Sequence, residues 1–100
     1  MPKAVGFSPD AERDLEDIAD YIARDNPARA LSFVRELRER CENIGLFPRA
    51  ARAFPALGED AHVLPVGHYV IFYRNLPADI SIERIIHGAR DIMALIASDS

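Results

Sequence analysis

The fold is decided by the stretch Tyr69-Val70-Ile71-Phe72-Tyr73-Arg74. In a β-strand, successive side chains point to opposite faces of the sheet. One face therefore carries Tyr69, Ile71 and Tyr73, and the other carries Val70, Phe72 and Arg74. An antiparallel sheet with helices on only one side normally shows a polar outer face. Because both faces of this strand are largely apolar, the strand needs cover on both sides.

Two further strands are predicted beside this one. The residues from His62 to Val66 and from Ile80 to His87 have strand character, and Gly67-His68 and the segment from Asn75 to Asp79 have turn composition. Such short turns join strands that are neighbours in the sheet. Residues 61–88 are therefore predicted to form a three-stranded antiparallel meander.

The first half of the chain has helical periodicity. A short apolar strand at residues 3–7 is followed by Ser8 and Pro9, a typical helix cap with proline at the first helical position. Apolar residues recur every three or four positions over 9–25 and again over 27–45. Because the connection between the two segments is short, they are predicted to form an antiparallel αα-hairpin.

The remaining segments complete an α+β fold. The stretch from Phe47 to Asp60 is predicted to be a loop that returns the chain to the sheet, and residues 91–97 a short terminal helix. The expected architecture is an N-terminal strand, an antiparallel αα-hairpin packed on a C-terminal antiparallel β-meander, and a short C-terminal helix. One hundred residues suit a single domain over residues 1–100.

A partner-binding groove follows from the two apolar faces. The hairpin can cover one face, and the alternation does not say which. Seven residues of terminal helix span only about 10 Å, which is less than the sheet. An exposed apolar groove on a small protein usually marks a partner site. The alternative is that the first strand, the loop from Phe47 to Asp60 or a second copy of the chain fills the groove.

Composition excludes several classes of function. The net charge of −4 argues against a broad cationic surface for nucleic acid. Because Cys41 is the single cysteine, no disulfide within the chain is possible, which fits a reducing compartment. Cys41 also falls on a helical apolar stripe. We expect no metal or other cofactor, because the three histidines lack metal-ligand spacing and no glycine-rich nucleotide motif is present. Without a signal sequence or membrane span, the expected location is the cytoplasm.

A set of charged residues on or beside the sheet could bind a target: Arg52, Arg74, Arg84, His87, Arg90 and Asp91. Arginines that converge on one face can clamp phosphate or carboxylate groups, and a histidine among them could transfer protons. For Arg90 and Asp91, the favoured reading is a salt bridge that ties the end of the last strand to the fold.

These residues also resemble a known family. The run from Phe7 to Ile18, with Tyr21-Ile22 and Asn26-Pro27, resembles the helical half of the RelE/ParE toxin superfamily of bacterial type II toxin–antitoxin systems. The segments from Val66 to Arg74 and from Ile82 to Ile92 resemble its ParE branch more specifically. The resemblance implies a toxin that folds as a helical hairpin on an antiparallel sheet. It also implies a cognate antitoxin that wraps over the toxin in a hetero-oligomer.

The branch decides which mechanism the resemblance implies. RelE-type relatives cleave mRNA on the ribosome, using basic sheet residues and a tyrosine or histidine near the C-terminus. Here Val70 stands where those relatives often have arginine, no Tyr, His or Lys follows His87, and Lys3 is the sole lysine. Resemblance to ParE implies growth inhibition by poisoning DNA gyrase through protein contact, without catalytic residues or direct nucleic-acid binding by the toxin alone. A ribosome-dependent mRNA endonuclease and a non-toxic partner-binding adaptor are the alternatives.

Two groups of site residues follow from these interpretations. The antitoxin is expected to contact the middle strand at Tyr69, Val70, Ile71, Phe72 and Tyr73. The cellular target is expected to contact Arg74, Arg84, His87 and Arg90.

Overall fold

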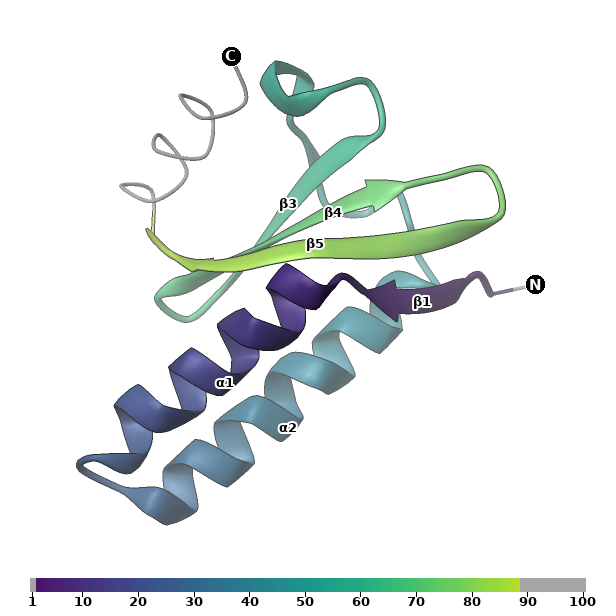
Figure 1. Ribbon diagram of the computed structural model, residues 1–100. Coiled ribbons are helices and arrows are strands. Elements are labelled where there is room, and N and C mark those ends of the chain that lie inside the picture. The colour runs from purple at the N-terminus through teal and green to yellow at the C-terminus, as the bar shows by residue number, and fades with distance from the viewer. Residues whose placement is uncertain (1, 89–100) are drawn as a thin grey trace.

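The computed structural model describes residues 2–88, which form two helices and a five-stranded sheet (Figure 1). The elements in chain order are β1 (Ala4–Phe7), α1 (Pro9–Ala23), α2 (Pro27–Ile44), β2 (Arg52–Ala53), the 3₁₀ turn η1 (Pro55–Leu57), β3 (Ala61–Val66), β4 (Tyr69–Asn75) and β5 (Asp79–His87). The predicted α+β class and the order of strand, helical hairpin and meander are confirmed. The predicted helix at 91–97 lies outside the described residues.

The strand order in the sheet is β1-β5-β4-β3-β2. Strands β3, β4 and β5 form the predicted antiparallel meander, and β1 pairs in parallel with β5. The loop predicted from Phe47 to Asp60 is wrong in part, because Arg52 and Ala53 pair with Val63 and His62 as strand β2. Two residues are too few to show strand periodicity, so only long-range pairing reveals this strand.

Both helices begin at the predicted residues. The Ser8 hydroxyl accepts a hydrogen bond from the Ala11 amide at 3.0 Å, and the Asn26 side chain accepts one from the Arg29 amide at the same distance. The helices end at Ala23 and Ile44, slightly before the predicted residues 25 and 45. Helix α1 ends before residue 25 because Asn26, the N-cap of α2, has an extended backbone that cannot continue the first helix.

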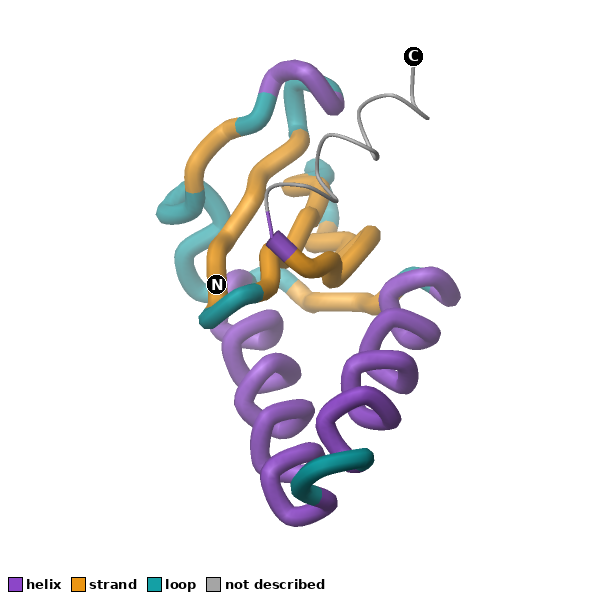
Figure 2. Tube along the Cα trace, turned by 90° about the vertical axis from the view of Figure 1, so that its left-hand side faces the viewer, coloured by secondary structure: helices purple, strands orange, loops and turns teal. Residues whose placement is uncertain are grey.

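The hairpin covers the face of β4 that carries Tyr69, Ile71 and Tyr73, and Figure 2 shows both helices on the same side of the strands. Ile71 and Tyr73 have no exposed surface, and they pack in one core with Leu15 and Leu37 of the two helices. This contact settles the choice of face, which the alternation of β4 leaves open.

The described residues cover the opposite face of the sheet only in part. Its smaller cluster of buried residues joins Leu57, Ala61, Val63 and Phe72, with Phe54 packed against it. Phe54 and Leu57 come from the segment after β2, so the loop fills part of the predicted groove. Val70 lies at the other end of this face and is only partly buried.

Candidate functional site

Three adjoining pockets of about 440, 390 and 510 Å³ surround the chain segment that leads into β2. Ala50 lines all three, and we call them together the Ala50 hollow. Its apolar lining includes Phe47, Ala51, Val63, Leu64 and Val70. The hollow extends from the end of α2 around the β3 edge of the sheet, so it reaches both faces.

The shortness of β2 explains why the hollow exists. The segment from Leu46 to Ala51 turns without pairing to β3, because β2 pairs with only two β3 residues. Tyr73 holds this segment near the sheet, since its hydroxyl donates a hydrogen bond to the Pro48 carbonyl at 2.8 Å. Phe47 is left 68% exposed. An exposed phenylalanine beside an apolar hollow is typical of a surface that binds a partner.

The rim of the hollow is positively charged. Its lining includes Lys3, Arg40, Arg49 and Arg52, and no aspartate or glutamate among the described residues lines any of the three pockets. Lys3 donates hydrogen bonds to the Asn75 side chain and the Leu76 carbonyl, both at 2.7 Å. Within the described part of the chain, the three arginines of the rim form no ion pair. In a chain of net charge −4, this local excess of cations favours an acidic partner segment.

The residues predicted to bind an antitoxin have different environments. Ile71 and Tyr73 are fully buried and Phe72 is nearly so. Burial raises the pKa of the Tyr73 hydroxyl. Tyr69 is partly buried, with its ring 5.6 Å from that of Phe33, and burial raises its pKa also. Val70 is partly buried and lines the hollow, as the buried Tyr73 also does.

Arg74 is engaged within the fold. Its guanidinium lies 2.7 Å from Asp60 and 3.3 Å from Glu83, and it covers the Phe72 ring at 5.2 Å. Gly58 permits this arrangement: its φ is +124°, and a Cβ there would lie 2.8 Å from the Arg74 guanidinium. These contacts give Arg74 a structural role between β4, β5 and the segment after β2.

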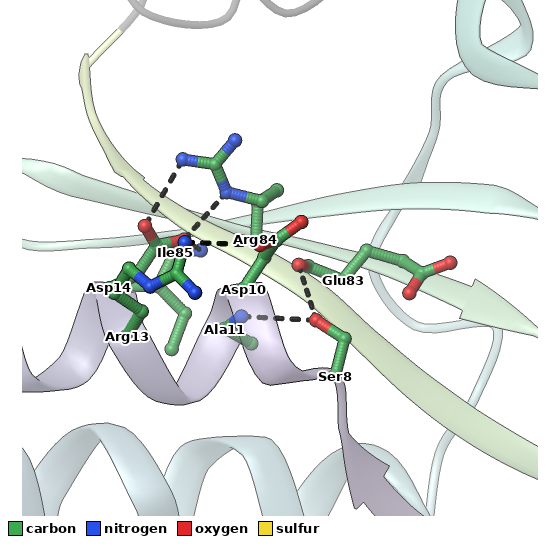
Figure 3. A network of polar contacts seen from close by, with 8 residues as sticks. All are labelled: Ser8, Asp10, Ala11, Arg13, Asp14, Glu83, Arg84 and Ile85. Atoms are coloured by element: carbon green, nitrogen blue, oxygen red, sulfur yellow. Dashed lines mark hydrogen bonds and ion pairs between the residues drawn. The ribbon is translucent and has the colours of Figure 1, made fainter.

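Arg84 is also bound by a carboxylate (Figure 3). Asp14 on α1 accepts hydrogen bonds from its guanidinium at 2.8 and 3.1 Å, and from the Ile85 amide at 2.8 Å. A β-bulge between Phe72 and Tyr73 shifts the pairing of β4 with β5 beside this contact. The arrangement fastens the first helix to the last strand.

Of the other predicted target residues, His87 lines one pocket of about 200 Å³ together with Arg84, and Arg74 is not part of that lining. His87 is exposed at the end of β5, where its ring lies 5.3 Å from Tyr69 and 6.2 Å from His68. Arg90 and Asp91 lie outside the described residues. Arg52 is exposed on β2 and belongs to the Ala50 hollow. The structure therefore does not bring Arg74, Arg84 and His87 together around one anion.

Catalytic and metal-binding signals are weak among the described residues. No cluster of three or more His, Cys, Asp or Glu side chains could hold a metal there. Burial raises the pKa of the Cys41 thiol to about 12, which makes it a poor nucleophile. Within the same range, no helix is long and apolar enough to cross a membrane.

Sequence reasoning missed the loop part of the hollow. Phe47, Ala50 and Ala51 lie in a segment whose prolines and arginines predicted only a loop. The available signal was Leu46-Phe47, an apolar pair directly after the helix end, and both residues prove to be exposed.

The hairpin on a mixed sheet and the hollow at the sheet edge define a small α+β domain with an open apolar hollow. Comparison with family models shows which family this domain belongs to. The chain belongs to the family of ParE toxins of the type II toxin–antitoxin system parDE, whose model matches residues 5–92.

Solved structures share this fold at low sequence identity. A chain of the chromosomal ParDE system from P. aeruginosa is 20% identical with a TM-score of 0.74, and the match covers 86% of this chain and 96% of that one. A chain of the toxin–antitoxin complex RelBE2 from Mycobacterium tuberculosis is 21% identical with a TM-score of 0.67, covering 87% and 99%. A comparison with curated proteins finds no match.

Proposed function

We propose that this ParE-family toxin is held inactive by a cognate antitoxin that fills the Ala50 hollow, and that the free toxin poisons DNA gyrase by protein contact. The observation that carries the first part is the hollow itself, which combines an apolar lining with a rim of cations and no lining carboxylate among the described residues. The two similar solved structures are toxin–antitoxin systems, which supports a partner of this kind.

The hollow indicates the chemistry of the antitoxin segment. Apolar side chains of the segment would contact Phe47, Leu64 and Val70, and acidic side chains would meet Arg40, Arg49 and Arg52. Apolar anchors supply most of the affinity of such an interface, whereas charges at its rim mainly increase the association rate. The expected partner segment is therefore amphipathic and acidic.

Gyrase is the better-supported target because the arginines of β4 and β5, Arg74 and Arg84, are already engaged by carboxylates. Arg74 is neutralised by Asp60 and Glu83, and Arg84 is bound by Asp14. A ribonuclease must attract a polyanion, and these carboxylates together with a net charge of −4 oppose that attraction. Poisoning by protein contact needs no such attraction.

Two assays test these claims separately. The chain is expressed alone and together with the protein encoded by the adjacent upstream gene, and growth is followed. We expect arrest with the chain alone and normal growth with both proteins. Purified toxin in excess should then block supercoiling by gyrase and leave mRNA intact in a translating extract. Normal supercoiling with cut mRNA would replace gyrase poisoning by ribonuclease activity, and normal growth in every case would reject the toxin proposal.

A further inference from the structure

Lys3, the sole lysine of the chain, is held in a fixed position by neutral groups. Its ammonium donates hydrogen bonds of 2.7 Å to the Asn75 side-chain oxygen and to the Leu76 carbonyl. Its backbone amide donates to the Gly45 carbonyl at 2.9 Å. No carboxylate among residues 2–88 forms an ion pair with the ammonium. The fold therefore positions the charge of Lys3 without neutralising it.

Arg49 supplies a second cation to the same pocket. This pocket of about 390 Å³ is the part of the Ala50 hollow that is lined by Lys3, Phe47, Pro48, Arg49, Ala50 and Asn75. The segment around Arg49 is held near the sheet, because the carbonyl of the preceding Pro48 accepts a hydrogen bond from the Tyr73 hydroxyl at 2.8 Å. The Arg49 guanidinium itself has no ion pair within the described part of the chain. The pocket thus has two cations, and no described carboxylate lines it.

The charges of the pocket fit a dianion. The fold uses two of the three N–H groups of the Lys3 ammonium, so one is left for a ligand. A guanidinium such as that of Arg49 can donate two parallel hydrogen bonds to one phosphate group. A carboxylate has one negative charge, whereas the phosphate of an ester carries about −1.5 to −2 near neutral pH. A phosphate dianion therefore balances both cations, and a carboxylate balances only one.

Phe47 gives the pocket a surface for an apolar group beside the phosphate. Its ring is 68% exposed and belongs to the same lining. Aromatic rings next to cations are a common platform on which proteins stack nucleobases. The volume of about 390 Å³ falls within the range of roughly 300–1,000 Å³ that is typical of small-molecule sites. We propose that Lys3 and Arg49 bind a phosphate dianion, either free phosphate or the phosphate of a small ester whose apolar part packs on Phe47.

This phosphate site overlaps the proposed antitoxin site. Because Lys3 and Arg49 belong to the rim of the Ala50 hollow, a bound phosphate excludes the acidic side chains of a partner from both cations. That competition rests on the proposed function, whereas phosphate binding itself is measured on the free toxin. A toxin that binds antitoxin but no phosphate would overturn the site and leave the proposed function intact. A toxin that binds phosphate but no antitoxin would do the reverse.

An NMR titration of the free toxin tests the site and distinguishes the two sources of phosphate. Inorganic phosphate, adenosine monophosphate and acetate are added separately at constant ionic strength and about pH 8, where the phosphates are dianions. We expect saturable shifts of the Lys3, Arg49 and Asn75 amides with both phosphates, and at least about tenfold weaker binding of acetate. Tighter binding of the nucleotide assigns the site to an ester packed on Phe47, and equal binding assigns it to free phosphate. Shifts without saturation, or acetate binding as tight as phosphate, would overturn the site.

Matched variants locate the binding. Arg49→Gln removes an exposed cation of the pocket, and Arg35→Gln removes an exposed arginine of α2 that lines none of the three pockets of the hollow. We expect Arg49→Gln to weaken phosphate binding at least about tenfold and Arg35→Gln to leave it within about twofold. Thermal unfolding without ligand checks that both variants are folded. Equal phosphate affinities in the two variants would overturn the assignment of Arg49 to a phosphate site.

Discussion

The carboxylate of Asp14 on α1 holds the guanidinium of Arg84 on β5 through hydrogen bonds of 2.8 and 3.1 Å (Figure 3). The same carboxylate also accepts a hydrogen bond from the Ile85 amide, and the Asp14 side chain is only 12% exposed. Charge-assisted bonds of this kind are stronger than neutral ones. An arginine that the sequence offers as a target contact thus fastens the helical hairpin to the sheet.

Asp14→Asn should lower the free energy of unfolding by about 1–3 kcal/mol, because the amide cannot balance the charge of Arg84 or accept all three hydrogen bonds. Urea denaturation measures the loss. Asp10→Asn is the matched control, since Asp10 is exposed and lies 3.8 Å from Arg13. The control should change stability by less than about 0.5 kcal/mol. Equal losses in the two variants would contradict the structural role of Asp14.

The ion pair of Glu12 with Arg38 should make stability depend on pH in the acid range. The hydrogen bonds from Arg38, at 2.8 and 3.3 Å, lower the pKa of Glu12. Because the pKa of Glu12 is lower in the folded state, the ion pair contributes its full stabilisation above the pKa of the unfolded state, about 4.3. This stabilisation is lost as the pH falls through the pKa of the folded state. Both side chains are half-exposed, so the contribution is below about 1 kcal/mol. In Glu12→Gln, the free energy of unfolding should fall less steeply as the pH is lowered in the acid range. The same pH dependence in both proteins would contradict the pairing.

Cys41 should be unreactive in the folded protein. The thiol is fully buried, and burial raises its pKa to about 12, so little thiolate is present near neutral pH. An alkylating reagent followed by mass spectrometry should modify the native chain far more slowly than the chain in denaturant. Rapid modification of the native chain at pH 7 would show that the core around α2 opens readily.

Gly45 should tolerate no side chain. A Cβ at this position would overlap the Lys3 carbonyl oxygen, which belongs to the backbone just before β1 and cannot rotate away. Gly45→Ala should therefore destabilise the fold by about 1–3 kcal/mol. Gly6→Ala is the control, because the space around it is open. Thermal unfolding of both variants compares them, and a Gly45→Ala variant as stable as Gly6→Ala would contradict the close approach of α2 to β1.

Most of the fold could be predicted from local patterns. The four-three spacing of apolar residues and the capping residues Ser8 and Asn26 specify both helices, and the alternation of β4 specifies the meander. Strand β2 could not be predicted, because its two residues are a strand only through pairing with His62 and Val63. The covered face of β4 could not be predicted either, because both faces are apolar and contacts distant in sequence, such as Tyr73 with Pro48, distinguish them.

The candidate site was less predictable than the fold. Arginines on strands indicate an anion site, but their charge is available only if no carboxylate pairs with them. Asp14 is 70 residues from Arg84 in the chain, and Asp60 is 14 residues from Arg74, at the end of the β3–β4 pair far from its turn, so neither pairing has a sequence signature. Arg49 and Arg52, two cations of the Ala50 hollow that form no ion pair within the described residues, lie on a segment with no regular periodicity.

Isothermal titration of the protein encoded by the adjacent gene into matched toxin variants tests the central claim, antitoxin binding in the Ala50 hollow, most directly. Phe47→Asp places a carboxylate in the hollow, and Leu31→Asp makes the same kind of change on α2 at a residue that is 73% exposed. We expect Phe47→Asp to weaken binding at least about tenfold and Leu31→Asp to leave it within about twofold of the unmodified toxin. Tight binding to Phe47→Asp, equal to that of Leu31→Asp, would contradict the assignment of the hollow as the antitoxin site.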